Sequence, residues 1–304
     1  MEYLPDEVVN ELKEYIIFKP KNKEELLNAV DTWCIDKDEA LIKYDHISLW
    51  NTSLITDMSN LFEKKENFND NINNWDVSSV TNMCEMFFKT KIYNKPLNLW
   101  NVSSVTDMSG MFLYAEFFNQ KLDSWDVSSV TNMSWMFAQA YKFNKNLNSW
   151  NVSLVIQMNG MFWIARSFNK KLDSWNVSSV NNMSLMFGNA RSFNQPLNSW
   201  DVSLVTNMSN MFVHAESFNQ SLDKWNVSSV ISTVGMFSDA KSFNQPLDSW
   251  DLSSVINMGT MFSQAKSFNQ DLNSWDVSSV TMMNDVFFDH KNFNKKNALW
   301  YNFD

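Results

Sequence analysis

Apolar residues recur along this chain with a fixed period of 25 residues. Tryptophan shows the period most clearly, because from residue 50 to residue 300 it occurs at every twenty-fifth position without an insertion or a deletion. Counted from each tryptophan as position 0, apolar residues usually follow at +2, +5, +8, +11, +12, +15, +18 and +22. Self-similarity at such a period is typical of solenoids, in which each repeat packs against its two neighbours. The pattern therefore predicts a stack of 25-residue coils, each named below by its tryptophan.

Two shorter periods coexist within each coil and predict two elements. Trp at 0 and Val at +2 alternate with polar residues, as in a short strand with one buried face. The apolar positions +8, +11, +12 and +15 are spaced by three and four residues, as on one face of a short helix. Threonine at +6 suits the N-cap of that helix, and it occurs at Thr81, Thr106, Thr131 and Thr206. We therefore expect each coil to be a strand, a tight Ser-Ser turn, two helical turns and a return loop.

Identical side chains would stack from coil to coil and form one continuous core. One polar residue is as regular as the tryptophan, since Asn occupies +19 in every coil from Asn69 to Asn294. A polar residue directly after a core Phe predicts a backbone role, an inward Asn ladder that satisfies N–H and C=O groups between coils. The alternative is a row of ligand-binding amides.

The two ends of the chain depart from the repeat. We expect a helix over residues 6–17, a second from an N-cap at Asn22 through residue 33, and a third over residues 38–44. A solenoid must shield its terminal core, so the sequence predicts a helical N-terminal cap over residues 1–45, a repeat solenoid over 46–281 and a C-terminal cap over 282–304.

The charge balance limits the partners. Lys and Arg number 24 against 34 Asp and Glu, which gives a net charge of −10. Binding to nucleic acid or to an anionic membrane requires clustered cations, so neither partner is expected. The start of the chain lacks the features of a signal peptide, and no run of about 18 apolar residues is present for membrane insertion. We expect an intracellular protein.

The repeated string, as in residues 125–143, resembles the BspA-like repeat family, mycoplasma-type surface proteins of unknown function. Similar repeats occur in giant DNA viruses and some protists, which makes a giant virus a plausible source and virion association an alternative location. The segment from Leu122 to Val130 is also similar to the core of a leucine-rich repeat, with Trp and Val at the inward leucine positions. The resemblance implies a right-handed solenoid used for adhesion or protein binding, without catalytic residues.

The fold class predicted is thus α/β, a right-handed, leucine-rich-repeat-like solenoid of about ten coils with a helical N-terminal cap. If the segment from +8 to +15 is a helix, positions +10, +13 and +14 face solvent. Most coils have small or polar residues there, but four middle coils have large apolar ones, with Tyr141 close by at +16. These residues are Leu113, Tyr114, Trp135, Trp163, Ile164 and Leu185.

Exposed apolar patches with Trp and Tyr anchors are typical of interaction sites. We therefore expect these six residues to bind a protein partner, which could be a second copy of the chain. The alternative is that these side chains fold onto neighbouring coils. A rival surface is the polar face at −1, +1 and +3, where Ser, Asp and Asn could accept polar or sugar ligands.

The function predicted is a non-enzymatic binding or scaffold module without cofactor or metal. The three histidines fall in distant coils or caps, so no Ser-His-Asp group can assemble. One alternative is an F-box-type adaptor for a ubiquitin ligase, because residues 4–17 resemble the opening of the F-box motif. Another is a hydrolase that uses a carboxylate pair, Asp123 with Asp126 or Asp248 with Asp251, and either pair could instead bind calcium. Asn is interspersed with Asp at −2 and +1, which favours a structural role for these two rows over an active site.

Overall fold

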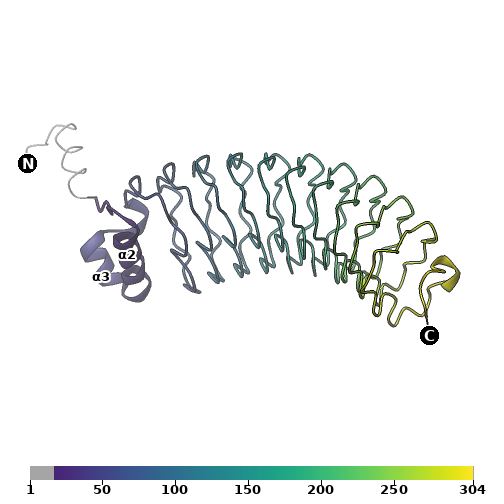
Figure 1. The fold of residues 1–304 in the computed structure, drawn as a ribbon. Helices are drawn as coiled ribbons and strands as arrows, with labels where there is room; N and C mark the ends of the chain where they lie inside the picture. The colour runs from purple at the N-terminus through teal and green to yellow at the C-terminus, as the bar shows by residue number, and fades with distance from the viewer. Residues whose placement is uncertain (1–16, 304) are drawn as a thin grey trace, which may run out of the picture.

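The chain forms a long, gently curved stack of coils with two helices at its N-terminal end (Figure 1). The computed structural model describes residues 17–303. Helices α2 (Lys23–Ile35) and α3 (Lys37–Tyr44) are followed by a short 3-10 helix, η1 (Ile47–Leu49), and the repeat then begins at Trp50. A second 3-10 helix, η2 (Lys295–Asn297), lies near the C-terminal end. The helix predicted over residues 6–17 falls, except for its last residue, outside the described part of the chain.

The two helices of the N-terminal end are those that the sequence predicts. The Asn22 side chain accepts a hydrogen bond from the Glu25 N–H and caps α2, as expected. Asp36 ends α2 and caps α3 in the same way through the Glu39 N–H. The buried face of α2 includes Trp33, whose ring centroid lies 6.0 Å from that of Trp50. This helix therefore covers the first coil of the core.

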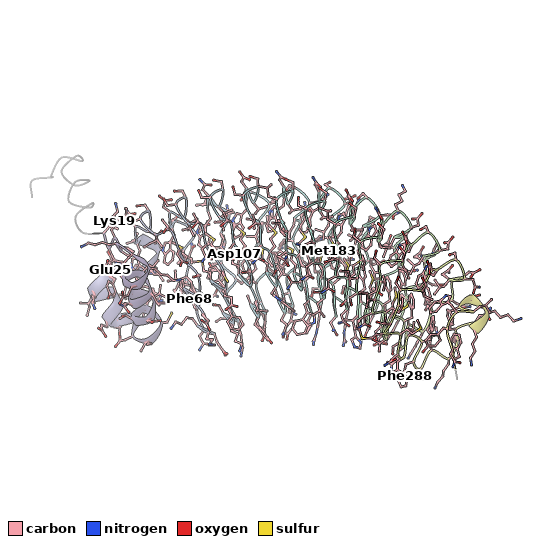
Figure 2. All side chains as sticks on the ribbon, viewed as in Figure 1. Lys19, Glu25, Phe68, Asp107, Met183 and Phe288 are labelled. Carbon is pink, nitrogen blue, oxygen red and sulfur yellow. The ribbon has the colours of Figure 1, made fainter. Side chains whose placement is uncertain are left out.

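The predicted core of stacked identical side chains is confirmed, and Figure 2 shows the side chains along the whole stack. From the Trp75 coil to the Trp250 coil, the residues at the repeating core positions are at most 3% exposed. The Phe rings at +12 lie parallel, with centroids of successive coils 5.3 to 5.8 Å apart. Each buried indole from Trp75 to Trp300 donates its Nε1–H to the carbonyl three residues before the preceding tryptophan, at 2.8 to 3.1 Å. A buried N–H without such a partner would be costly.

The local structure of the coils differs from the prediction. The strand expected at the tryptophan is wrong, because successive coils are joined by isolated parallel bridges at +7 instead, from Asp57 with Asn82 to Asn257 with Met282. The helix expected over +8 to +15 is also wrong, since α2 and α3 are the only α-helices in residues 17–303. The segment is a succession of tight turns, each closed by an N–H that donates to the carbonyl three residues earlier, as from Ala138 to Trp135 at 3.0 Å.

Left-handed residues explain why these turns do not continue as a helix. In every coil from Trp50 to Trp275 the residues at +10 and +14 have φ between 50° and 63°. Each such residue interrupts a right-handed helix. The N–H groups at +8, +10, +12 and +14 then point out of the coil and donate to carbonyls at +7, +9, +11 and +13 of the next one. In the Trp125 coil, for example, Trp135 donates to Asn159 at 2.9 Å and Gln139 to Trp163 at 2.7 Å.

Two rows of polar side chains also connect the coils. The threonines at +6 cap no helix, contrary to the prediction, because the hydroxyl of Thr106, for example, donates to the Thr81 carbonyl of the preceding coil at 3.2 Å. The Asn ladder at +19 is confirmed, since each Oδ1 accepts the backbone N–H of the next Asn at 2.8 to 3.1 Å, from Asn69 to Asn294. These Asn residues are half-buried or exposed rather than inward, so the ladder runs along the rim of the core.

The contacts of the repeat continue to the C-terminal end of the stack. Trp300 still makes the indole hydrogen bond of the earlier tryptophans, and the rings of Tyr301 and Phe303 pack against Phe287 at 5.3 and 5.5 Å. In the Trp275 coil, which has no complete coil after it, the N–H groups at +8 and +10 (Met283 and Asp285) have no backbone acceptor among residues 17–303. The predicted boundaries of the two caps stay predictions.

A buried histidine replaces the usual alanine at +15 of the last complete coil. His290 is only 8% exposed, and neither ring nitrogen has a hydrogen-bond partner among the described residues. Burial therefore lowers the pKa of His290 below its ordinary value of 6.5.

The Asn ladder predicts a specific loss on truncation. Asn144→Ala removes the acceptor of the Asn169 N–H, and the free energy of unfolding should fall by about 1 kcal/mol, the usual net value of such a bond. Urea denaturation measures the change. Asn74→Ala, at an exposed Asn outside the ladder, is the control, and equal effects of the two substitutions would contradict the structural role of the ladder.

His290 predicts a pH dependence of stability. Above pH 6.5 the ring is neutral in the folded and unfolded chains. Below it, the unfolded chain binds a proton that the buried ring does not, so the free energy of unfolding falls as the pH falls through 6.5 toward the lowered pKa. His290→Ala, which restores the usual residue, should make stability depend less on pH between 7.5 and about 5.5. An unchanged dependence in urea titrations at the two pH values would contradict the assignment.

Candidate interaction surface

The six predicted binding residues lie together on one side of the stack, and we call them the ridge: Leu113, Tyr114, Trp135, Trp163, Ile164 and Leu185. They belong to four consecutive coils, which the hydrogen bonds between coils hold in register. All six are half-buried. The ridge is therefore a continuous feature of the middle coils, although it is less exposed than a solvent-facing helix would make it.

The two ridge tryptophans lie across the coil that follows each of them. A Cβ atom added to Gly160 would lie 2.3 Å from the Trp135 ring, and one added to Gly188 would lie 3.1 Å from that of Trp163. The absence of a side chain at these glycines thus makes room for the indoles. The two indoles also contact each other edge to face, with centroids 5.7 Å apart. The alternative considered for the ridge, that its side chains fold onto neighbouring coils, accounts for this half-burial.

Four ridge residues occupy strained backbone positions. Tyr114, Trp135, Ile164 and Leu185 have φ between 56° and 60°, in the left-handed region that residues other than Gly, Asn and Asp seldom adopt. Each such residue costs of the order of 1 kcal/mol relative to glycine. The same strain occurs outside the ridge at Lys64, Glu85 and Thr260, so the ridge differs in having large apolar residues at these positions.

Sequence reasoning missed several neighbours of the ridge. Phe88 contacts Tyr114 edge to face at 5.9 Å, and the Lys89 ammonium lies 5.4 Å from the Tyr114 ring. On the other side, the Arg166 guanidinium lies 4.9 Å from the ring of Tyr141. Phe88 occupies +13, as Leu113 and Trp163 do, so its place beside the ridge could have been predicted from the sequence. The contacts of Lys89 and Arg166 with the aromatic rings could not.

The rival polar face is a row of structural turns. At +1 of every coil from Trp50 to Trp275, the Asn or Asp Oδ1 accepts the N–H at +3, at 2.9 to 3.2 Å. Hydrogen bonds from the Ser253 hydroxyl and N–H lower the pKa of Asp251, and Ser128 does the same to that of Asp126. Both carboxylates accept these bonds as anions. The −2 row includes links between coils, such as the 3.0 Å bond from the Asn148 amide to Asp173.

The carboxylate pairs and the F-box-like segment were the other two candidate sites. Asp123, Asp126, Asp248 and Asp251 are all exposed. The described residues contain no group of three or more His, Cys, Asp or Glu that could hold a metal ion. The F-box-like segment lies almost entirely within residues 1–16, outside the described part, so the adaptor function stays a prediction.

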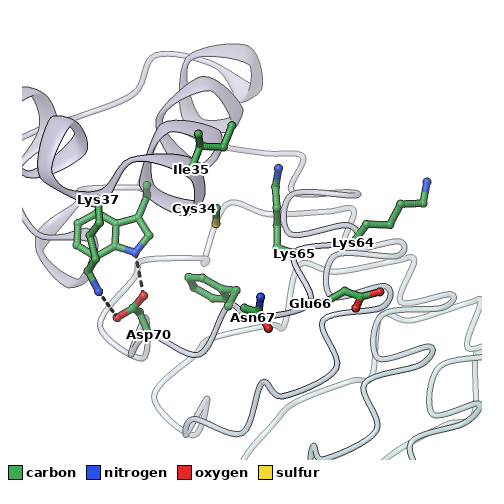
Figure 3. Close-up of a pocket in the computed structure, with 10 residues that line it drawn as sticks. Cys34, Ile35, Lys37, Lys64, Lys65, Glu66, Asn67 and Asp70 are labelled. Carbon is green, nitrogen blue, oxygen red and sulfur yellow. Dashed lines mark hydrogen bonds and ion pairs between the residues drawn. The ribbon is translucent and has the colours of Figure 1, made fainter.

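A cleft of about 620 Å³ lies where α2 meets the first coils (Figure 3). In it, the Trp33 indole and the Lys37 ammonium each donate to the Asp70 carboxylate at 2.9 Å. Burial raises the pKa of Asp70, but the two hydrogen bonds outweigh it and lower the pKa. Burial also raises the pKa of Cys34 to about 11, so its thiol is a weak nucleophile near neutral pH. These contacts attach the helical end to the stack.

Comparison with known proteins agrees with this architecture. The fold and its surface define a repeat solenoid, and the model of the family described as "Mycoplasma protein of unknown function, DUF285" matches residues 35–150, 115–205 and 192–300. The chain belongs to this family, and the resemblance to BspA-like repeats is confirmed. No curated protein matches the chain.

One solved structure with similarity is the crystal structure of a TLR13–ssRNA13 complex. The alignment has a TM-score of 0.34 and 8% sequence identity, and it covers 93% of this chain but 41% of the other. The chain thus spans less than half the length of that structure. Within residues 17–303, no helix has the length and apolar character needed to cross a bilayer.

Proposed function

We propose that the protein is a non-enzymatic binding solenoid and that the ridge is the surface that contacts a partner protein. The observation that carries the proposal is the row of large apolar residues on left-handed backbone positions in consecutive coils. The core does not require them, because other coils have Gly or polar residues such as Asn, Asp, Lys and Thr at the same positions and still stack. Selection for binding would explain why residues that lower stability, and that the core does not need, occupy these positions.

The carboxylates favour binding over catalysis. A glycosidase-type pair needs one carboxyl group held in the protonated form by a raised pKa. Hydrogen bonds from Ser253 lower the pKa of Asp251, and Asp126 is in the same situation. These groups are ionised near neutral pH and serve the turns in which they lie. We therefore propose no catalytic role and no cofactor.

The handedness of the stack, the location and the kind of partner are proposed from the resemblance to BspA-like and leucine-rich repeats. A right-handed, leucine-rich-repeat-like stack would present the ridge as a continuous side surface, as solenoids commonly do when they bind proteins. The repeats shared with giant DNA viruses support an intracellular or virion-associated location. The partner is a protein, and a second copy of the chain is one candidate.

The proposal predicts that the two ridge tryptophans are required for binding. In the double variant Trp135→Ser with Trp163→Ser, partner capture should fall at least about tenfold, because each truncated hot-spot residue costs about 2 kcal/mol or more. The measurement is quantitative mass spectrometry of proteins captured from the native cell by wild type and variant, with circular dichroism to verify folding.

The matched control replaces carboxylates of the polar face, in the double variant Asp126→Asn with Asp201→Asn. It should retain the same proteins as wild type. Loss of the captured proteins in this control, together with full capture by the tryptophan variant, would assign binding to the polar face and contradict the proposal. Sedimentation of wild type and of the tryptophan variant tests the second copy as partner.

A further inference from the structure

A group of cations beside the ridge has no carboxylate partner. We call it the cation strip, and it occupies positions +16 to +21 of the Trp100, Trp125 and Trp150 coils: Lys121, Lys142, Lys145, Arg166, Lys170 and Lys171. None of the six forms an ion pair with a carboxylate of residues 17–303. On a chain with a net charge of −10, such a local excess of unpaired positive charge is unexpected.

Other coils show that cations at these positions can be paired. At +16, Lys91 binds Glu66 of the preceding coil at 2.8 Å, and Lys241 binds Glu216 in the same way at 2.9 Å. Within the strip, the only acidic residue at +16 to +21 is Glu116, and Asp123 at +23 lines a cleft with Lys121 and Lys145, but neither carboxylate forms an ion pair within residues 17–303. The repeat geometry therefore permits neutralisation by a neighbouring coil, and the middle coils lack it.

The strip adjoins the ridge. Tyr141, at +16 between the two surfaces, contacts Arg166 of the strip through its ring and donates its hydroxyl to Gln139 at 2.9 Å. Gln139 in turn donates its backbone N–H to the carbonyl of Trp163 in the ridge. On the far side, Lys121 and Lys145 line an open cleft of about 550 Å³ together with Gln120 and Asp123. The contacts of Tyr141 and Gln139 thus connect the Arg166 end of the strip to the ridge.

We propose that the partner of the ridge is a protein segment with acidic residues beside its apolar anchors, and that the cation strip binds those acidic residues. This inference rests on the proposed function and specifies the chemistry of the partner. Complementary charge raises the association rate and selects among partners that have similar apolar anchors. The open cleft between Lys121 and Lys145 can admit a carboxylate side chain.

The observations favour a protein over a nucleic acid or a second copy. Leu113, Ile164 and Leu185 offer side-chain packing but no stacking surface for a base, and the Trp135 ring already lies against Gly160. The net charge repels a long polyanion. A second copy would have to offer its exposed carboxylates at +1 to the strip, but these already accept hydrogen bonds from Ser. A contact between the strip of one copy and the polar face of another joins two different surfaces, so it would not close into a symmetric dimer.

The test uses fluorescein-labelled synthetic 15-residue peptides and fluorescence anisotropy. The first peptide alternates Glu with Leu and Phe, the second replaces Glu by Ser, and the third replaces Glu by Lys. The full chain should bind the Glu peptide at least about tenfold more tightly than the other two, and the affinity should fall as the salt concentration is raised from about 50 to 300 mM. Absence of binding to the Glu peptide, or equal affinity for the three, would overturn the inference.

The triple variant Lys121→Gln, Lys145→Gln and Lys171→Gln should weaken the Glu peptide at least about tenfold, since each rim charge contributes to a common field. The matched control, Lys224→Gln, Lys266→Gln and Lys296→Gln, removes the same number of charges from exposed lysines that lie outside the strip and form no ion pair within residues 17–303, and it should leave the affinity within about twofold. Equal losses in both variants would overturn the assignment. Tighter binding of a labelled 20-nucleotide poly(U) than of the Glu peptide would favour nucleic acid instead.

Capture from the native cell separates the two proposals. If capture depends on Trp135 and Trp163 but not on the strip lysines, the ridge is the binding surface and the acidic partner is wrong. If capture survives the tryptophan substitutions, the proposed function itself fails. The inference is supported when both sets of substitutions reduce capture of the same proteins and the control lysines do not.

Discussion

The structure depends on a row of backbone hydrogen bonds that each coil donates to the next one, while the N–H at +6 donates to the preceding coil. At +8, +10, +12 and +14 the N–H groups donate to carbonyls of the next coil, at every step from the Trp50 coil to the Trp275 coil. In a regular parallel sheet, successive peptide units alternate between the two neighbours. Here the intervening units close tight turns within the coil, which leaves left-handed residues at +10 and +14. A donor meets its acceptor only if this segment has the same length in every coil, in agreement with the uninterrupted 25-residue period.

Aligned peptide units give the two ends of the stack different requirements. The N-terminal end presents carbonyls, and here Lys23 of α2 binds Asp57 at 3.1 Å while the apolar face of α2 covers the core. The C-terminal end presents N–H groups, and here two aspartates, Asp285 and Asp289, occupy the left-handed positions. Negative charge near free N–H groups and positive charge near carbonyls are stabilising, as at helix ends. The same left-handed positions carry most of the ridge, so the surface proposed for binding is a direct consequence of how the coils are joined.

Much of the fold could be predicted from the sequence, because its strongest signals are periodic. The tryptophan spacing predicted the stacked core, the invariant Asn predicted the ladder, and Asn22 predicted the start of α2. The strand and helix within the coil were wrong, because apolar spacings of three and four residues fit a succession of turns as well as a helix. A signal for the left-handed residues was present, since Gly, Asn and Asp recur at +10 and +14, as in Gly110, Asn210 and Asp239. The ridge residues were identified by position, but their half-burial depends on contacts such as that of Trp135 with Gly160, which requires three-dimensional structure.

The most direct test of this account compares glycine with alanine at one left-handed position. Thr260 has φ of 56°, so Thr260→Gly should be more stable than Thr260→Ala by about 1 kcal/mol, the reverse of the order in a helix. At Ser238, outside the left-handed positions, Ser238→Ala should be at least as stable as Ser238→Gly. The measurement is the free energy of unfolding of the four variants in urea. If alanine is the more stable residue at position 260, the coils are not joined by the left-handed turns described, and the account is wrong.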